Sequence, residues 1–144
     1  MKDVIVIHDI TSESEWKNIF EVCINHCNKF DIIFTEDKLD EDNRFITGKK
    51  EFKNLRNVTI KPWDGMDNSI IISGSLDSEA RKLIYKYTSP SFEGGVNDLW
   101  HYNIYKDDIL FLGIQDFSVC LLENHAGVLE LLKDIGVDPQ TLED

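Results

Sequence analysis

The chain has 144 residues, with 27 acidic against 15 basic side chains and a net charge of −12. This charge argues against nucleic acids and anionic membranes as partners, because binding phosphate requires lysine and arginine. An apolar share of 42% is well above that of disordered chains, and a domain of this length needs no disulfide or metal to fold.

The first third of the chain predicts a strand, a helix and a second strand. Residues 3–10 form a continuous β-branched run with two acids and no cleavage site, so they predict a buried strand, and a cytoplasmic location is expected. A helix is expected over 13–29, where Ser12 and Glu15 fit a capping box. Residues 30–35 predict the next strand. The apolar face of the helix comprises Trp16, Ile19, Phe20, Cys23, Ile24 and Cys27.

The middle of the chain gives a less uniform pattern. Residues 36–43 predict a solvated acidic loop. Residues 45–46 and 58–60 could each be a short strand. A strand at 69–74 and a helix at 78–87, capped by Asp77 or Ser78, follow. The segment between the two short strand candidates is basic, with Lys49, Lys50, Lys53 and Arg56.

The last third predicts three strands and a helix. The strands at 99–105, 109–114 and 117–122 are separated by short acidic turns, which favours an antiparallel meander. A helix over 127–135 ends at Gly136. The whole chain, 1–144, is therefore expected to be a single α+β domain, with a mixed, mainly antiparallel sheet and about three helices packed on it.

Two cysteines and a histidine are spaced so that they could meet on one side of a helix. Cys23, His26 and Cys27 could supply three zinc ligands. Cys23 and Cys27 also belong to the apolar face of the helix, which favours core thiols in a reducing compartment. Cys120 lies in an apolar strand that offers little to lower its pKa. We expect neither a metal site nor a cofactor.

His101 is the strongest single candidate for acid–base chemistry. It alternates with Trp100 and Tyr102 along a strand and should face away from both. An enzyme of unknown type, using His101 and nearby carboxylates in a cleft, is one alternative function. No serine lies in a nucleophile-elbow motif, and the pair Gly94-Gly95 lacks the context of a phosphate loop.

The negative charge is concentrated toward the C-terminus. Residues 1–72 hold 14 acids and 10 bases, whereas residues 73–144 hold 13 acids and 5 bases. Aromatic side chains among charges of one sign are typical of protein-binding surfaces, where the rings anchor and the charges steer. The candidate partner-binding residues are Asp98, Trp100, Tyr102, Tyr105, Asp107, Asp108 and Asp116, together with Asp37, Asp40, Glu41 and Asp42 of the acidic loop.

In size, acidity and lack of a catalytic motif, the chain resembles the small bacterial immunity proteins that neutralise nuclease toxins. The resemblance lies in composition, so it assigns no role to any residue. It implies a non-enzymatic inhibitor whose acids cover a cationic cleft on a basic protein partner. Besides the enzyme, the remaining alternative is a regulatory domain that self-associates through an open sheet edge.

Overall fold

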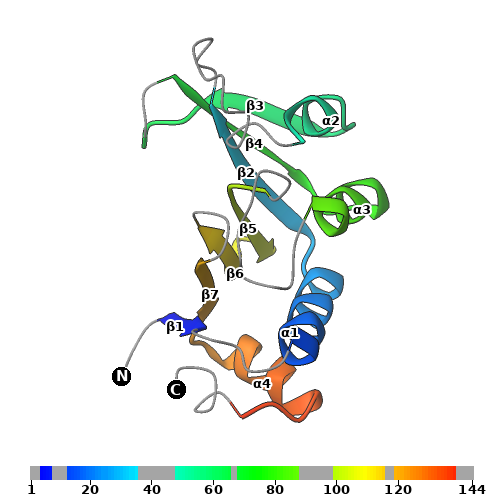
Figure 1. Ribbon diagram of the computed structural model, residues 1–144, viewed down its shortest axis with the longest axis vertical. Coiled ribbons are helices and arrows are strands. Elements are labelled where there is room, and N and C mark those ends of the chain that lie inside the picture. Colours follow the sequence, from blue (N-terminus) through cyan, green and yellow to red (C-terminus); the bar gives the residue numbers. More distant parts are fainter. Residues whose placement is uncertain are drawn as a thin grey trace.

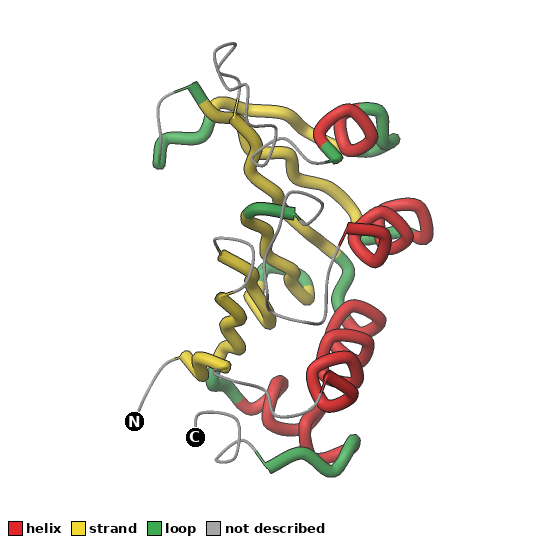
Figure 2. Tube along the Cα trace, viewed as in Figure 1, coloured by secondary structure: helices red, strands yellow, loops and turns green. Residues whose placement is uncertain are grey.

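The structure is a computed structural model that describes residues 4–7, 13–35, 48–65, 68–87, 99–115 and 119–138. The strands in these ranges form one sheet in the order β1-β7-β6-β5-β2-β4-β3 (Figures 1 and 2). Each pairing between these strands is antiparallel. The strands are β1 (Val4–Ile7), β2 (Lys29–Thr35), β3 (Val58–Pro62), β4 (Ser69–Ser75), β5 (His101–Lys106), β6 (Ile109–Gln115) and β7 (Val119–Glu123).

Strand β2 joins the two halves of the sheet. It pairs with β4 on one side and with β5 on the other. Beyond β5 the chain forms the meander β5-β6-β7, and β1 adds to the outer side of β7. Beyond β4 lies β3, which is an edge strand of the sheet. The middle of the sheet is therefore built from segments about 70 residues apart in sequence, since Asp31 pairs with Asn103.

The helices described are α1 (Glu13–His26), α2 (Lys49–Lys53), α3 (Ser78–Tyr87) and α4 (Ala126–Asp134). Figure 1 shows α1, α2 and α3 along one side of the sheet, and α4 packs against α1 at the end where β1 lies. The buried residues of the helices and of the sheet form one apolar cluster. None of the described helices packs on the opposite face of β2, β4 and β5, which we call the helix-free face.

Alternation along β2 assigns its side chains to the two faces of the sheet. Phe30 and Phe34 point toward the helices, and their rings lie 5.8 and 5.9 Å, centroid to centroid, from the ring of Phe52 in α2. Ile32 between them is fully buried in the same cluster. Because successive strand residues point to opposite faces, Asp31 belongs to the helix-free face.

Side-chain caps fix helices α1 and α3 in place. The Asp77 carboxylate accepts a hydrogen bond of 2.9 Å from the backbone N–H of Ala80, which makes it the N-cap of α3. From the same helix, the Arg81 guanidinium donates to the carbonyls of Ile24 and Cys27, each at 3.1 Å. These carbonyls lie at the C-terminus of α1, where a helix lacks internal donors and favours positive charge. Arg81 thus joins α3 to the end of α1.

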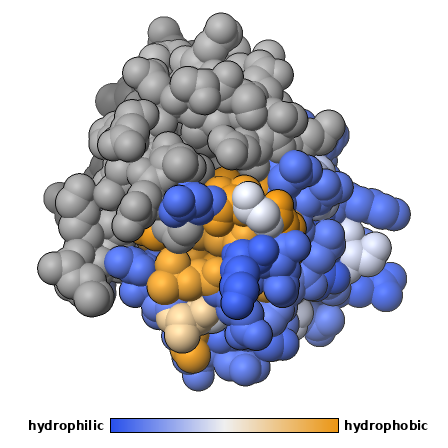
Figure 3. Space-filling model, turned by 90° about the horizontal axis from the view of Figure 1, so that it is seen from below, coloured by the Kyte–Doolittle hydropathy of each residue, from blue (hydrophilic) through white to orange (hydrophobic). Residues whose placement is uncertain are grey.

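Helix α4 covers one end of the core. Val128 and Leu132 are fully buried, whereas Leu129 between them is 38% exposed. Viewed from this end of the molecule, the surface shows an apolar area bordered by hydrophilic residues (Figure 3). His125 caps the helix, since its Nδ1 accepts from the N–H of Val128 and its Nε2 lies 3.0 Å from the carbonyl oxygen of Leu110.

The structure confirms the predicted α+β class, the mainly antiparallel sheet and the C-terminal meander. It corrects three details. The sheet is not mixed, because every pairing between the described strands is antiparallel. Helix α1 ends at His26 and not near 29, because β2 already begins at Lys29. The basic segment between the two short strand candidates forms the fourth helix, α2. Of those two candidates, 58–60 is part of β3, and 45–46 lies outside the described residues.

Candidate functional site

Asp31 is the centre of a polar network on the helix-free face. Its Oδ1 accepts a hydrogen bond of 3.0 Å from the side-chain amide of Asn103, and its Oδ2 accepts one of 2.5 Å from the Tyr105 hydroxyl. Both donors come from β5, the neighbouring strand, where Asn103 is the direct cross-strand partner of Asp31. Since each carboxylate oxygen has its own donor, the orientation of the Asp31 carboxylate is fixed.

Gly113 provides the space that this network needs. It lies on β6 as the cross-strand partner of Asn103. A Cβ atom at this position would come within 2.5 Å of the Asn103 Oδ1 atom, which is far too close for a real contact. The missing side chain therefore allows the Asn103 amide to lie over β6 and to turn its N–H toward Asp31.

Tyr105 is held in its protonated form. Burial raises the pKa of its hydroxyl above the ordinary value, and the hydrogen bond to Asp31 and the negative charge of Asp31 raise it further. The hydroxyl therefore stays a donor to Asp31 throughout the physiological pH range. The phenol ring is half-buried and contributes to the wall of the pocket described below.

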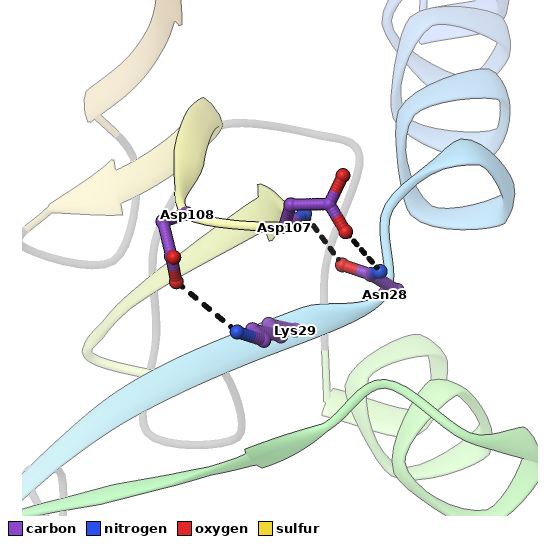
Figure 4. A network of polar contacts seen from close by, with 4 residues as sticks. All are labelled: Asn28, Lys29, Asp107 and Asp108. Atoms are coloured by element: carbon purple, nitrogen blue, oxygen red, sulfur yellow. Dashed lines mark hydrogen bonds and ion pairs between the residues drawn. The ribbon is translucent and has the colours of Figure 1, made fainter.

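The β5–β6 turn places two further acids beside Asn28 and Lys29, at the start of β2 (Figure 4). Asp107 has a left-handed backbone conformation with φ of 55°. The side chain of Asn28 holds it, accepting from the Asp107 N–H at 2.7 Å and donating to its Oδ1 at 3.1 Å. Asp108 lies 3.1 Å from the ammonium group of Lys29, and its side chain is 93% exposed. Both turn acids thus stand at the surface with defined positions.

These side chains line an open pocket of about 390 Å³ on the helix-free face. The pocket crosses from edge strand β3 over β4 and β2 to the β5–β6 turn. Among the described residues that line it, three are acids and Lys29 is the single cation. The polar lining consists of Asp31, Asp107, Asp108, Lys29 and Asn57 and the hydroxyl residues Thr59, Ser73, Ser75 and Tyr105. We call this the Asp31 pocket.

The structure brings together three of the candidate partner-binding residues, since Tyr105, Asp107 and Asp108 all line the Asp31 pocket. The expectation that Tyr102 binds a partner is corrected. Tyr102 is 1% exposed and packs in the core, because its side chain points to the face that the helices cover. Trp100 is half-buried beside His101, away from the pocket. Six candidates lie outside the described residues, namely Asp37, Asp40, Glu41, Asp42, Asp98 and Asp116.

His101 faces away from Tyr102, as the alternation predicts. Its ring lies 6.0 Å, centroid to centroid, from each of the indoles of Trp63 and Trp100. His101 begins β5, whereas Asp107 follows the end of that strand. At about 3.3 Å per residue, six residues separate the two by about 20 Å. Asp107 and its neighbour Asp108 are therefore too far away to act with His101 in catalysis.

Besides Lys29, Phe30 and Gly74, five residues that line the pocket were missed from the sequence. Asp31 left a readable signal, because it is the one acid inside the apolar run 30–35. The other four are short polar residues of β3 and β4 and of the turn before β3, and no local pattern distinguishes them from ordinary surface positions. The five residues are Asp31, Asn57, Thr59, Ser73 and Ser75.

The thiols considered as zinc ligands lie in the core. Cys23 and Cys27 are each 1% exposed, and burial, the largest cause, raises the pKa of both to about 12. His26 is exposed, with its ring 5.2 Å from that of Phe111. In the described part of the chain, no group of three or more histidine, cysteine or acidic side chains is arranged to hold a metal ion.

A second pocket, of about 510 Å³, lies at helix α2 and has the opposite charge. The described residues that line it include Lys49, Lys50 and Lys53. The single acid among them, Glu51, is bound by the hydroxyl of Tyr87 and lies 3.2 Å from the ammonium of Lys86. The hydrogen bond from Tyr87 lowers the pKa of Glu51. These contacts fasten α2 to α3.

None of the helices in the described ranges has the length and apolar character needed to cross a membrane. Comparison of the chain with protein-family models, with curated proteins and with solved structures finds no match in any of the three.

Proposed function

We propose that this chain is a protein-binding inhibitor of the immunity type, which neutralises a basic partner such as a bacterial nuclease toxin by covering its active site. The observation that carries the proposal is the Asp31 pocket, where Asp31, Asp107, Asp108 and Tyr105 lie together with a single cation among the described lining residues. A net charge of −12 adds a long-range attraction for any cationic surface.

The exposed turn acids would act mainly on the rate of encounter. Charges at the rim of an interface steer a partner of opposite sign and change the association rate more than the dissociation rate. Asp108 is almost fully exposed, and the side chain of Lys29, whose ammonium group lies beside it, is 52% exposed. This attraction is screened by salt over a Debye length of about 8 Å at physiological ionic strength.

The pocket itself would act on the lifetime of the complex. Tyr105 is half-buried and held by Asp31, so it offers an aromatic surface that loses little freedom on binding. A carboxylate that becomes desolvated against a cation of the partner contributes to the dissociation rate. The two parts of the site are thus separable by kinetics, with Asp107 and Asp108 governing association and Asp31 governing dissociation.

The test begins with capture of the partner from host lysate at low salt and its identification by mass spectrometry. Association is then measured by surface plasmon resonance for the wild type and for the double variant Asp107→Asn/Asp108→Asn. Asparagine tolerates the left-handed backbone at position 107 and can still accept from Asn28. The matched control is Glu130→Gln/Asp134→Asn on α4, which removes the same charge from exposed positions elsewhere.

We expect the turn variant to associate about 3- to 10-fold more slowly at low salt, with the difference shrinking at high salt, and the control to associate like the wild type. The partner's enzymatic activity should fall to zero at one equivalent of the chain. Equal association rates for all three proteins at low salt would refute the role of the turn acids. A captured partner that stays fully active when saturated would refute inhibition.

A further inference from the structure

We infer that the Asp31 pocket is a guanidinium-binding site, so that one arginine side chain of the basic partner docks on the Asp31 carboxylate. This inference rests on the proposed function, because the proposed function supplies the partner protein that carries the arginine. The preference for a guanidinium over an ammonium group follows from the geometry of the pocket.

The Asp31 carboxylate retains acceptor capacity on both oxygens. An ionised carboxylate offers about four lone-pair sites, two on each oxygen. Asn103 uses one site on Oδ1 and Tyr105 uses one on Oδ2. Each oxygen therefore keeps one further site, and Asp31 belongs to the wall of the pocket. Two N–H donors of one planar group can use one free site on each oxygen, and arginine is the side chain that supplies such a pair.

The negative charge of Asp31 is not neutralised by the described part of the protein. The donors to Asp31, an amide and a phenol, are both uncharged. The cation nearest along the strand, Lys29, is engaged with Asp108 at 3.1 Å. A half-buried carboxylate whose donors are neutral can form charge-assisted hydrogen bonds with a cation that enters from outside.

The rest of the lining favours arginine over lysine. Thr59, Ser73 and Ser75 place hydroxyl groups around the pocket, and each can accept a hydrogen bond. A guanidinium has five N–H donors in one plane, so it can bind the carboxylate and still reach these hydroxyls. It is also more weakly hydrated than an ammonium group, which makes its transfer into a half-enclosed pocket less costly.

The test uses the full, ¹⁵N-labelled chain and two small probes, N-acetyl-arginine methylamide and N-acetyl-lysine methylamide. The backbone of each probe carries no charge, so the side chain is its single charged group. Amide chemical shifts are followed in separate titrations. We expect the arginine probe to shift the amides of Asp31, Ser73 and Tyr105 with a dissociation constant of about 1 mM, and the lysine probe to bind about tenfold more weakly. Butylguanidinium, a monocation without a peptide backbone, should bind like the arginine probe, and a much tighter affinity for butylguanidinium would indicate a small-molecule site instead of a docking site for a protein.

Two variants interrogate the pocket by different means. Asp31→Asn removes the charge at nearly constant shape, and we expect it to raise the dissociation constant of the arginine probe by about tenfold or more. Thr59→Phe fills the pocket from an exposed strand position that tolerates an aromatic residue, so it should block the probe while Asp31 and its network stay intact. Asp134→Asn on α4 removes one charge far from the pocket and should leave binding unchanged.

The inference is overturned if the two probes bind equally, if the shifts fall outside the pocket, or if Thr59→Phe leaves arginine binding intact. Such results leave the proposed function standing, provided that neutralising Asp107 and Asp108 still slows association with the basic partner. The converse result, selective arginine binding in a chain that inhibits no partner, would refute the proposed function and keep the guanidinium site.

Discussion

Gly113 offers a direct test of how the Asp31 network is built. The substitution Gly113→Ala would place a Cβ atom 2.5 Å from the Asn103 Oδ1 atom, about 1 Å inside ordinary contact. Since Asn103 is a flexible side chain, it should rotate away and lose its 3.0 Å hydrogen bond to Asp31. A hydrogen bond to a charged group contributes about 1.5–3 kcal/mol.

The expected net cost is smaller than the lost hydrogen bond. Replacing glycine by alanine restricts the unfolded chain, which returns about 0.4–1 kcal/mol of stability. We therefore expect Gly113→Ala to lower the free energy of unfolding by about 1–2 kcal/mol. In an Asn103→Ala background the obstacle is gone, and the same substitution should be neutral or should stabilise by about 0.5 kcal/mol.

Urea denaturation of the wild type, both single variants and the double variant measures this coupling. The side-chain amide resonances of Asn103 report independently whether its hydrogen bond to Asp31 is lost. We expect a coupling free energy of about 2 kcal/mol. If Gly113→Ala costs the same in both backgrounds, the clearance that Gly113 provides for Asn103 is not what the network requires, and the reasoning fails.

Three further predictions concern the framework around the site. Arg81→Ala should lower the free energy of unfolding by about 2 kcal/mol in urea melts, because the carbonyls of Ile24 and Cys27 lose their donor, and an unchanged melt would exclude this link between α1 and α3. Asp77→Ala should cost about 1 kcal/mol, whereas Asp77→Asn, which can still cap, should cost less; equal losses would argue against capping. With a folded-state pKa of about 12, the thiols of Cys23 and Cys27 should stay unmodified by iodoacetamide at pH 8 until urea unfolds the chain. Their contribution to the free energy of unfolding should be full below pH 9 and should fall as the pH rises toward 12, because in that range only the thiols of the unfolded chain ionise. Rapid labelling of the folded protein would contradict this.

The prediction of individual elements succeeded where short-range patterns decide structure. The apolar spacing and a cap at Asp77 or Ser78 predicted a helix over about 78–87, which the structure has at Ser78–Tyr87, and the acidic turn 107–108 predicted the β5–β6 hairpin. Helix α2 was missed because it is five residues long and buries Phe52 alone, too little for a periodic signal. Its start after Gly48, in the left-handed region with φ of 80°, depends on the surrounding fold.

The candidate site was predicted in part. Charge and aromatic content directed attention to Tyr105, Asp107 and Asp108, and the structure places all three on one pocket. The same reasoning also selected Tyr102, because the sequence around a tyrosine near acidic residues does not show whether its side chain faces solvent or the core. Which of two neighbouring strand residues is buried depends on the face that the helices cover, and one face is chosen for the whole sheet at once.

The sequence by itself determined most of the elements, the class of fold and the excess of negative charge, because apolar periodicity, capping and composition act over a few residues or over the chain as a whole. Only the tertiary structure decided that Asp31 lies against Asn103 and Tyr105, across more than 70 residues of chain. Such a contact depends on strand order and register, and those are fixed when the core packs as a unit.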